Sequence, residues 1–368
     1  MPDDPRRIHS LDFLRGVASL AVCWFHLTRY QFQTPDGPAY EAVRAAGAHG
    51  WLGVEVFFVI SGFVIPYSLG RAGYRLRDYP AFVLKRVVRL DPPYLAALAL
   101  ILALAFAEAA RAGQPAAVEG EPLGWARVLL HLGYLNMFFG HEWLNPAFWT
   151  LAIELQFYAL VGLAFPLLGS RRRGARLAAL ALFAALGCLS EVGLRRSSGA
   201  PTSSFIFHFV FLFVMGAATF QRRAGLAGRF EHAATMAGAA AGALLTVGPL
   251  PTLAGLATAA AIRLYRRRSA VTDFFGNISY SLYLTHWPVG HVALSVLSAK
   301  VVGDATDARK LLVLSLSLGL SFAAAYALFL LVERPAQRWS SRIRYGRAGR
   351  DARAAETSGL APAAPAET

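Results

Sequence analysis

Charged residues are scarce in this sequence. They make up 16% of its 368 residues, against 56% hydrophobic residues, and the mean hydropathy is +0.44. Apolar runs near the length of about 20 residues needed to cross a bilayer core of roughly 30 Å recur throughout. The scarcity of charge therefore places the chain among polytopic helical membrane proteins rather than soluble ones.

Three other features are scarce or missing. The two cysteines, Cys23 and Cys188, both lie inside apolar segments, where a small buried thiol is ordinary, so they indicate no redox compartment. No clear small-residue cleavage site follows the first apolar segment, which we interpret as a retained helix rather than a signal peptide. No internal repeat of the kind that transporters often carry is visible.

The hydrophobic pattern predicts an all-α fold with about ten membrane-spanning helices. The shorter apolar stretch 125–140 is interpreted as a re-entrant or interfacial helix. The predicted spans are approximately 10–30, 51–70, 82–107, 146–168, 176–193, 203–220, 231–247, 249–265, 274–299 and 310–333.

Basic residues outnumber acidic ones, 36 to 22, which gives a formal charge of +14. In a soluble protein this surplus would favour nucleic-acid binding, but here the basic residues fall between apolar segments, so no nucleic-acid partner is expected. With the amino terminus inside, 26 of the 36 fall on the cytoplasmic side and nine on the other, and Arg15 lies within the first helix. The positive-inside rule therefore predicts that both termini are cytoplasmic. We predict a membrane domain over 1–339 and a largely disordered tail over 340–368.

Arg15 and His26 are the most informative pair. Eleven helical steps of about 100° leave an offset of only about 20°, and a rise of about 1.5 Å per residue separates them by about 16 Å on one stripe. An ionisable residue costs at least ~2.5–3.5 kcal/mol at the centre of a spanning helix, so such residues usually face a cavity or a partner. The pair indicates a polar path through the membrane.

A basic run precedes the third predicted span. Lys85, Arg86 and Arg89 fit ordinary positive-inside charge, or Arg86 and Arg89, three residues apart on one face, clamp phosphate groups. Arg15, on the same side of the membrane, would strengthen such a site. Asp12, three residues before Arg15, fits a role in neutralising that arginine.

Two glutamates also lie in predicted spans. Glu55 begins the second span, where a carboxylate can simply favour the positive end of the helix dipole. Glu154 lies among aromatic and aliphatic residues of the fourth span, where it takes part in catalysis or substrate binding or serves as a structural partner of Arg15 or Arg89.

Three further candidates carry weaker signals. His286, beside Trp287 in the ninth span, fits a hydrogen-bonded packing role as well as a functional one, and His208 fits packing better. Glu333 and Arg334 are expected to form an interfacial cap or ion pair at the end of the last span.

Several of these segments, in order, resemble the acyltransferase-3 family of integral membrane acyltransferases, which modify bacterial surface glycans and some small molecules. The resemblance covers residues 8 to about 339. It rests on IHSLDFLRGVASLAVCWFH, GVEVFFVISGF, KRVVRLDPPY, FWTLAIELQFY, ISYSLYLTHWP and the closing ERP.

The resemblance implies roles for particular residues. An Arg and a His separated by ten residues in the first helix, here Arg15 and His26, would be required for transfer, together with an arginine pair, here Arg86 and Arg89. The family also carries an acidic residue in the motif of the fourth span, which here is Glu154.

The resemblance carries further expectations. Members often have two adjacent glutamates in the fourth span, whereas this chain has Leu155 after Glu154, which puts a role for a second carboxylate in doubt. Some members fuse a soluble hydrolase-like domain after the membrane unit, and the roughly thirty residues beyond the last span leave no room for one. The enzyme would then deliver its acyl group directly or use a separate extracytoplasmic partner or a second copy, in a bacterial inner membrane.

The chemistry follows from the charges. Acyl-CoA is polyanionic and cytoplasmic, so Arg86, Arg89 and Arg15 suit its phosphates, with acetyl-CoA the family expectation. Neutral His26 can take the proton of an acceptor hydroxyl as it attacks the thioester, or it can form an acyl-imidazole. Glu154 can orient His26 or hold acceptor hydroxyls. No permanently bound cofactor and no metal are expected.

The acceptor stays open among a glycan, a lipid-linked sugar and a small molecule, with Asp12, Glu55, Trp149 and His286 as candidate acceptor or supporting residues. Aromatics near the 108–145 connection fit either sugar stacking or interfacial anchoring. These are Trp125, Tyr134, Trp143 and Trp149. The competing function is a proton-coupled transporter or flippase, which would also carry intramembrane His, Glu and Arg.

Overall fold

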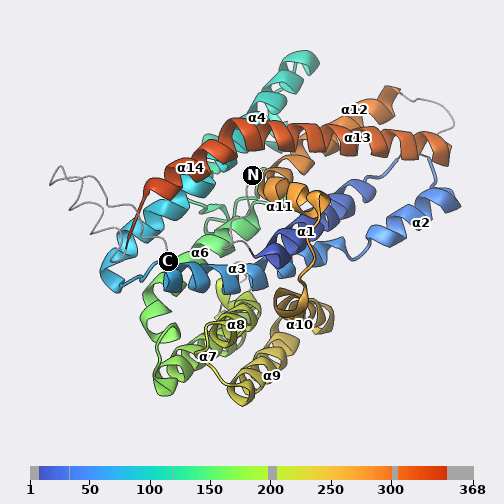
Figure 1. Ribbon diagram of the computed structural model, residues 1–368. Helices are drawn as coiled ribbons and strands as arrows, with labels where there is room; N and C mark the ends of the chain where they lie inside the picture. Colours follow the sequence, from blue (N-terminus) through green and yellow to red (C-terminus); the bar gives the residue numbers. More distant parts are fainter. Residues whose placement is uncertain (1–7, 33, 119, 198–204, 301–305, 346–368) are drawn as a thin grey trace, which may run out of the picture.

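The computed structural model consists almost wholly of helices (Figure 1). It describes residues 8–32, 34–118, 120–197, 205–300 and 306–345. Within these ranges, strands β1 (Ala117–Val118) and β2 (Glu121–Pro122) form a short antiparallel pair. The α-helices are α1 (His9–Thr28), α2 (Pro38–Gly47), α3 (Gly53–Arg71), α4 (Tyr79–Ala112), α5 (Trp125–His131), α6 (Trp149–Leu168), α7 (Arg173–Ser197), α8 (Ile206–Arg223), α9 (Arg229–Thr246), α10 (Pro249–Leu264), α11 (Ala270–Thr285), α12 (Val292–Lys300), α13 (Asp307–Leu328) and α14 (Arg334–Arg342). The shorter turns are η1 (Gly50–Leu52), η2 (Leu76–Asp78), η3 (Asn136–Phe138), η5 (His286–His291) and η6 (Phe329–Glu333).

The described residues of every predicted span are mainly helical, so the all-α prediction is confirmed. Four stretches of the described chain are long and apolar enough to cross a membrane by length and composition. The others fall short of that criterion; α10, for example, has 16 residues, which rise about 24 Å. The number of ten spans therefore stays a prediction. The four stretches are Pro38–Arg71, Leu76–Ala112, Trp149–Leu168 and Asp307–Arg342.

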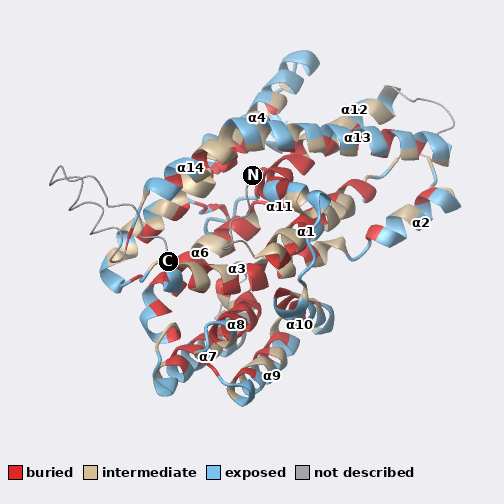
Figure 2. Ribbon diagram, viewed as in Figure 1, coloured by how far each residue is buried: buried red, intermediate tan, exposed pale blue. Residues whose placement is uncertain are grey.

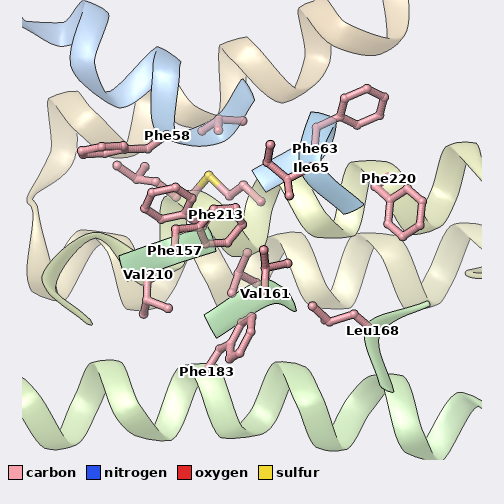
Figure 3. Packing of buried hydrophobic residues seen from close by; sticks show 14 of the residues in the cluster. Phe58, Phe63, Ile65, Phe157, Val161, Leu168, Phe183, Val210, Phe213 and Phe220 are labelled. Atoms are coloured by element: carbon pink, nitrogen blue, oxygen red, sulfur yellow. The ribbon is translucent and has the colours of Figure 1, made fainter. Parts of the chain in front are cut away.

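The apolar core is centred on α8, which packs against α3, α7, α9 and α10 and is buried along most of its length (Figure 2). Its phenylalanines interlock with those of α3 and α6 (Figure 3). The rings of Phe157 and Phe213 stack with their centroids 4.2 Å apart, and Phe58 lies 5.0 Å from Phe213. Offset and tilted ring packing of this kind adds to the burial of apolar surface.

Glycines bring α3 and α8 into backbone contact. A Cβ added at Gly62 would collide with the carbonyl oxygen of Phe213, and one at Gly216 would collide with that of Val59. Small residues at helix crossings are how membrane bundles gain close packing. The crossing fixes the position of α3, which forms one wall of the candidate site.

Helix α1 packs along α11 in the same way. A Cβ at Gly276 would meet the backbone of Asp12, and one at Gly16 would approach Phe275. This close crossing holds the two helices together over much of their length. It brings His26, near the end of α1, next to His286, which directly follows α11.

Two segments, η5 and η6, wind as π-helix rather than α-helix. Pro288 lies within η5 and Pro335 is the second residue after η6, and proline has no N–H for the regular helical ladder. Wide π-helical turns recur at functional sites. Here they carry His286 and Glu333, two residues of the candidate site.

The end of the described chain packs on α4. Lys85 donates from Nζ to the carbonyl oxygen of Ile343 and lies over the ring of the buried Tyr345. Residues 340–345 of the predicted tail thus contact the membrane unit. Residues 346–368, also predicted to belong to the tail, lie outside the described residues.

Candidate active site

A cavity of about 150 Å³ lies among α1, α3, α4, α6 and α11. Charged and hydroxyl side chains share its wall with apolar ones. Ionisable groups are costly inside a membrane bundle, so their concentration here marks a functional site. The lining residues are Arg15, Val54, Phe57, Phe58, Ile60, Ser61, Val64, Ile65, Ser68, Arg86, Arg89, Leu90, Thr150, Leu151, Glu154, Tyr158, Tyr280 and Tyr283.

Three guanidinium groups line this cavity. Arg15 comes from α1, and Arg86 and Arg89 come from one face of α4. Arg86 is only 8% exposed, lies over the rings of Phe82 and Tyr158, and its Nε has no hydrogen-bond partner in the described chain. Each of these arginines is a planar donor suited to phosphate oxygens. The cluster is therefore shaped to accept an anion.

Glu154 faces the same cavity from α6. Its Oε1 accepts a 2.6 Å hydrogen bond from the Ser61 hydroxyl, and it also interacts with the Tyr158 hydroxyl. In the described chain it makes no hydrogen bond to His26, which sequence reasoning had considered. Ser61 and Tyr158 both lie inside the motifs quoted above. Tyr158 shares α6 with Glu154, whereas the contact with Ser61 depends on how α3 packs against α6. Leu155 packs among apolar residues.

Glu333 is a residue whose setting the sequence did not indicate. It is 3% exposed, and its Oε2 accepts hydrogen bonds from the Ser281 N–H (3.1 Å) and hydroxyl (2.6 Å). Its carboxylate interacts electrostatically with Arg15 and Arg89. The expected ion pair with Arg334 is absent from the described residues, because the Glu333 carboxylate lies inside the bundle, bonded to Ser281. Glu333 is thus a counter-charge of the arginine cluster.

His26 contacts a second histidine. Its Nδ1 lies 3.1 Å from Nε2 of His286 and 3.1 Å from the carbonyl oxygen of Val22. Nδ1 of His286 lies 3.1 Å from the carbonyl oxygen of Leu282, and the His286 side chain is fully buried. The arrangement is a pair of imidazoles held by helix carbonyls, with His26 half-buried.

An aromatic layer separates the cavity from this histidine pair. Phe57, Thr150 and Tyr283 line the cavity, but neither His26 nor His286 does. The Thr150 and Tyr283 hydroxyls are 2.7 Å apart, the Phe57 and Tyr283 ring centroids are 5.7 Å apart, and the Tyr283 ring is 5.9 Å from His286. The arginines and the histidines therefore occupy two compartments.

Other predicted residues lie outside these two compartments. Glu55 is buried rather than interfacial, and its Oε2 has no hydrogen-bond partner in the described part of the chain. Trp149 packs between aromatic rings, 5.5 Å from Phe209, and His208 packs edge-on against Phe209. These contacts give Trp149 and His208 a packing role.

Asp12 belongs to a separate cluster at the start of α1. Ligand atoms of His9, Asp12 and Asp273 lie within 4.8 Å of one another, a spacing that metal ions accept. Asp273, however, pairs with Arg268 at 3.3 Å, so part of its charge is already compensated. His9 and Asp12 lie at the opposite end of α1 from His26. None of the three residues lines the cavity.

The four aromatics near the 108–145 connection differ in exposure. Trp125 is 76% exposed, whereas Tyr134 and Trp143 are buried, with the Tyr134 hydroxyl donating to Asp91. Stacking on a sugar requires an open ring face, which Tyr134 and Trp143 do not offer in the described structure. Trp125 alone retains that option among the four, since Trp149 is half-buried.

Comparisons with known proteins relate the chain to acyltransferases. The family model described as an acyltransferase domain matches residues 8–334. "Protein 2 in picA locus" of Rhizobium radiobacter is 36% identical over 100 residues, which are 27% of this chain and 46% of that protein, so the match spans less than half of it. The protein named as membrane-bound transacylase BcsY of Komagataeibacter xylinus is 28% identical over 329 residues, covering 82% of this chain and 77% of its own length.

No solved structure matches the chain significantly. The family model, by contrast, covers nearly all of the described residues and includes every charged residue of the cavity and both histidines of the pair. The chain therefore belongs to the acyltransferase-3 family and is a membrane acyltransferase.

Proposed function

We propose that this protein moves an acyl group, with acetyl the first candidate, from cytoplasmic acyl-CoA to a hydroxyl of a glycan, a lipid-linked sugar or a small molecule. It does so in a bacterial inner membrane with both termini in the cytoplasm, as the distribution of Lys and Arg predicts. A separate extracytoplasmic partner or a second copy of the chain can assist delivery.

The arginine cluster is the observation that carries this proposal. Arg15, Arg86 and Arg89 line one cavity together with Glu154, and Glu333 interacts with Arg15 and Arg89 from outside the lining, so positive charge is in excess. The Nε of buried Arg86 has no hydrogen-bond acceptor among the described residues, so it can donate to a bound ligand. Phosphate oxygens of CoA satisfy both the charge and the donor.

The cavity volume sets what part of the donor enters. About 150 Å³ is below the roughly 300–1,000 Å³ typical of pockets that enclose a drug-sized ligand. The nucleotide then stays at the cytoplasmic mouth while the neutral pantetheine arm extends along α1 toward His26. His26 takes the proton of the acceptor hydroxyl, a general-base role typically worth about 10²–10⁴-fold.

A transporter is the less favoured function. An arginine cluster that suits a polyanionic donor, on the same helix as a histidine that can take a proton, favours group transfer. Membership of an acyltransferase family also argues for group transfer rather than transport.

Sealed right-side-out vesicles test the proposal. They are loaded with labelled acetyl-CoA and offered a membrane-impermeant sugar acceptor outside, with His26→Ala vesicles as the control. We expect label on the external acceptor only when His26 is present. Label confined to acceptors enclosed with the donor would place the acceptor site on the cytoplasmic side, and no label on any acceptor would contradict acyl transfer from acetyl-CoA.

A further inference from the structure

The hydrogen bonds of the two histidines determine where their protons lie. Nδ1 of His286 faces the carbonyl oxygen of Leu282 at 3.1 Å, and a carbonyl oxygen only accepts, so this nitrogen carries a proton. A neutral imidazole has one N–H, so Nε2 of His286 holds a lone pair. That lone pair faces Nδ1 of His26 at 3.1 Å.

The same reasoning fixes His26. Its Nδ1 faces two acceptors, Nε2 of His286 and the carbonyl oxygen of Val22, each at 3.1 Å. Nδ1 must therefore donate, and the lone pair of neutral His26 lies on Nε2. If both protons were on Nε2 instead, the Nδ1 lone pair of each ring would face a carbonyl oxygen, which is unfavourable. One neutral arrangement satisfies every contact.

A charged His286 would be unfavourable. Its side chain is fully buried, and no carboxylate of the described chain bonds to either histidine. Glu154 instead bonds to Ser61, and Glu333 bonds to Ser281. A buried charge without a partner is expensive, so the pair is held neutral.

We propose that His286 is a positioning residue that holds His26 in the tautomer whose free Nε2 acts as the base. This inference rests on the proposed function. In the reaction the acceptor O–H bond breaks and its proton moves to Nε2 of His26. The acceptor oxygen bonds to the thioester carbonyl carbon, the C–S bond breaks, and the leaving sulfur takes the proton back from Nε2.

His286 acts most strongly while His26 holds that extra proton. The Nδ1–H of the resulting imidazolium donates a charge-assisted hydrogen bond to Nε2 of His286, which is stronger than the bond between two neutral rings. The stabilisation therefore appears along the reaction path rather than in donor binding. Its loss lowers kcat and leaves the KM for acyl-CoA, which depends on the distant arginines, unchanged.

Two isosteric substitutions test the role. His286→Gln can place its amide oxygen near the position of Nε2, where it accepts from His26, whereas His286→Asn is shorter and places its amide near Nδ1. We expect His286→Asn to lower kcat by about 10- to 150-fold, the range of a lost charge-assisted hydrogen bond, and His286→Gln to recover most of the rate. Both variants are polar, so a folding defect would affect both alike. It could not account for a difference in kcat between them.

His291→Gln is the matched control. His291 lies in the same η5 turn and stacks on Trp287 at 4.3 Å, but the described structure gives it no hydrogen bond to His26. We expect its kcat and donor KM to stay close to those of the unmodified enzyme. An equal loss in His291→Gln and His286→Asn would indicate general disturbance of η5 and overturn the positioning role.

The outcomes separate this inference from the proposed function. His26→Ala, measured in parallel, is expected to be inactive. If His26→Ala is inactive but His286→Asn turns over at the unmodified rate, or Gln and Asn are equally impaired, the role of His286 is overturned and the proposed function stands. If His26→Ala remains active, the proposed function itself fails.

Discussion

Two polar regions share helix α1, and they are built on opposite principles. Around Arg15 the cavity gathers three guanidinium groups with the carboxylate of Glu154, and the buried carboxylate of Glu333 interacts with Arg15 and Arg89 from outside the lining. Around His26 there is one neutral imidazole partner and two helix carbonyls. The first region is suited to holding a multiply charged ligand, and the second to moving a single proton.

The difference explains why ten residues separate Arg15 from His26. A guanidinium cluster beside the imidazoles would disfavour protonation of His26 during the reaction by like-charge repulsion. The length of α1 between them, about 16 Å, keeps that repulsion weak while both remain within one bundle. Charge recognition and proton transfer are thus assigned to separate ends of one helix.

Removing the histidine should have the largest effect. We expect His26→Ala to lower the transfer rate by about 10²–10⁴-fold, because the general base is lost while apolar helix packing is retained. The check is transfer from labelled acetyl-CoA by purified protein, with His208→Ala, a histidine that packs against Phe209, as the control. Activity above about a tenth of the unmodified rate would argue against a base at this position. An acyl group trapped on His26 would instead favour the covalent route.

The arginine region should respond differently. We expect Arg86→Ala and Arg89→Ala each to raise the KM for acyl-CoA by about 10- to 150-fold, since each removes charge-assisted contacts, with Lys restoring only part. The measurement compares acyl-CoA with an acyl-pantetheine thioester that lacks the nucleotide phosphates.

Lys85 provides the matched control for that prediction. It has the same charge and helix as the arginines but contacts Ile343 instead of the cavity, so Lys85→Ala should leave donor KM nearly unchanged. Equal losses with both donors in the arginine variants would show that these residues do not recognise phosphate.

Opening the aromatic layer should have an intermediate effect. Tyr283→Ala removes the ring between the cavity and His286, and we expect acyl-CoA hydrolysis to rise several-fold relative to transfer because water gains a route to the thioester. Tyr283→Phe keeps the ring and removes only the hydroxyl that meets Thr150. A ratio of hydrolysis to transfer that is the same in all three proteins would show that this layer does not separate the compartments.

The smallest effect on the transfer rate is expected from a substitution where α3 and α8 cross. Gly216→Ala forces a methyl group against the backbone of Val59 and should destabilise the fold by about 1–3 kcal/mol, shifting the cavity wall but not the histidine pair. Thermal unfolding in detergent measures the loss. Gly238→Ala, where an added Cβ meets open space in α9, should be neutral or stabilising by about 0.4–1 kcal/mol. Equal melting temperatures would indicate that α3 and α8 adjust freely.

Hydrophobic runs were sufficient to locate the helices, because burial in lipid requires long apolar segments with internally satisfied backbone. They did not reveal where a helix widens into a π-turn, since a local change of winding leaves the run of apolar residues intact. Glu333 shows the error that follows when the π-turn is not visible in the sequence. Its neighbour Arg334 suggested an ion pair, and only the π-turn of η6 directs the carboxylate toward Arg15 and Arg89.

The histidine pair was beyond sequence reasoning for a different reason. His26 and His286 are 260 positions apart, and their contact depends on how closely α1 and α11 cross. Both residues were recognised as candidates because a histidine within an apolar helix is costly. Their partnership is a property of the assembled bundle, and a single sequence contains no direct signal for it.

The layer formed by Phe57, Thr150 and Tyr283 has a consequence for the energised membrane. A continuous file of water from the arginines to the histidines would offer protons a conducting wire, and each proton crossing 100 mV dissipates about 2.3 kcal/mol. In the described structure the Tyr283 ring, packed against Phe57, lies between the arginine cavity and His286, where such a file would have to run. A layer of apolar rings at this point therefore opposes proton leak along α1.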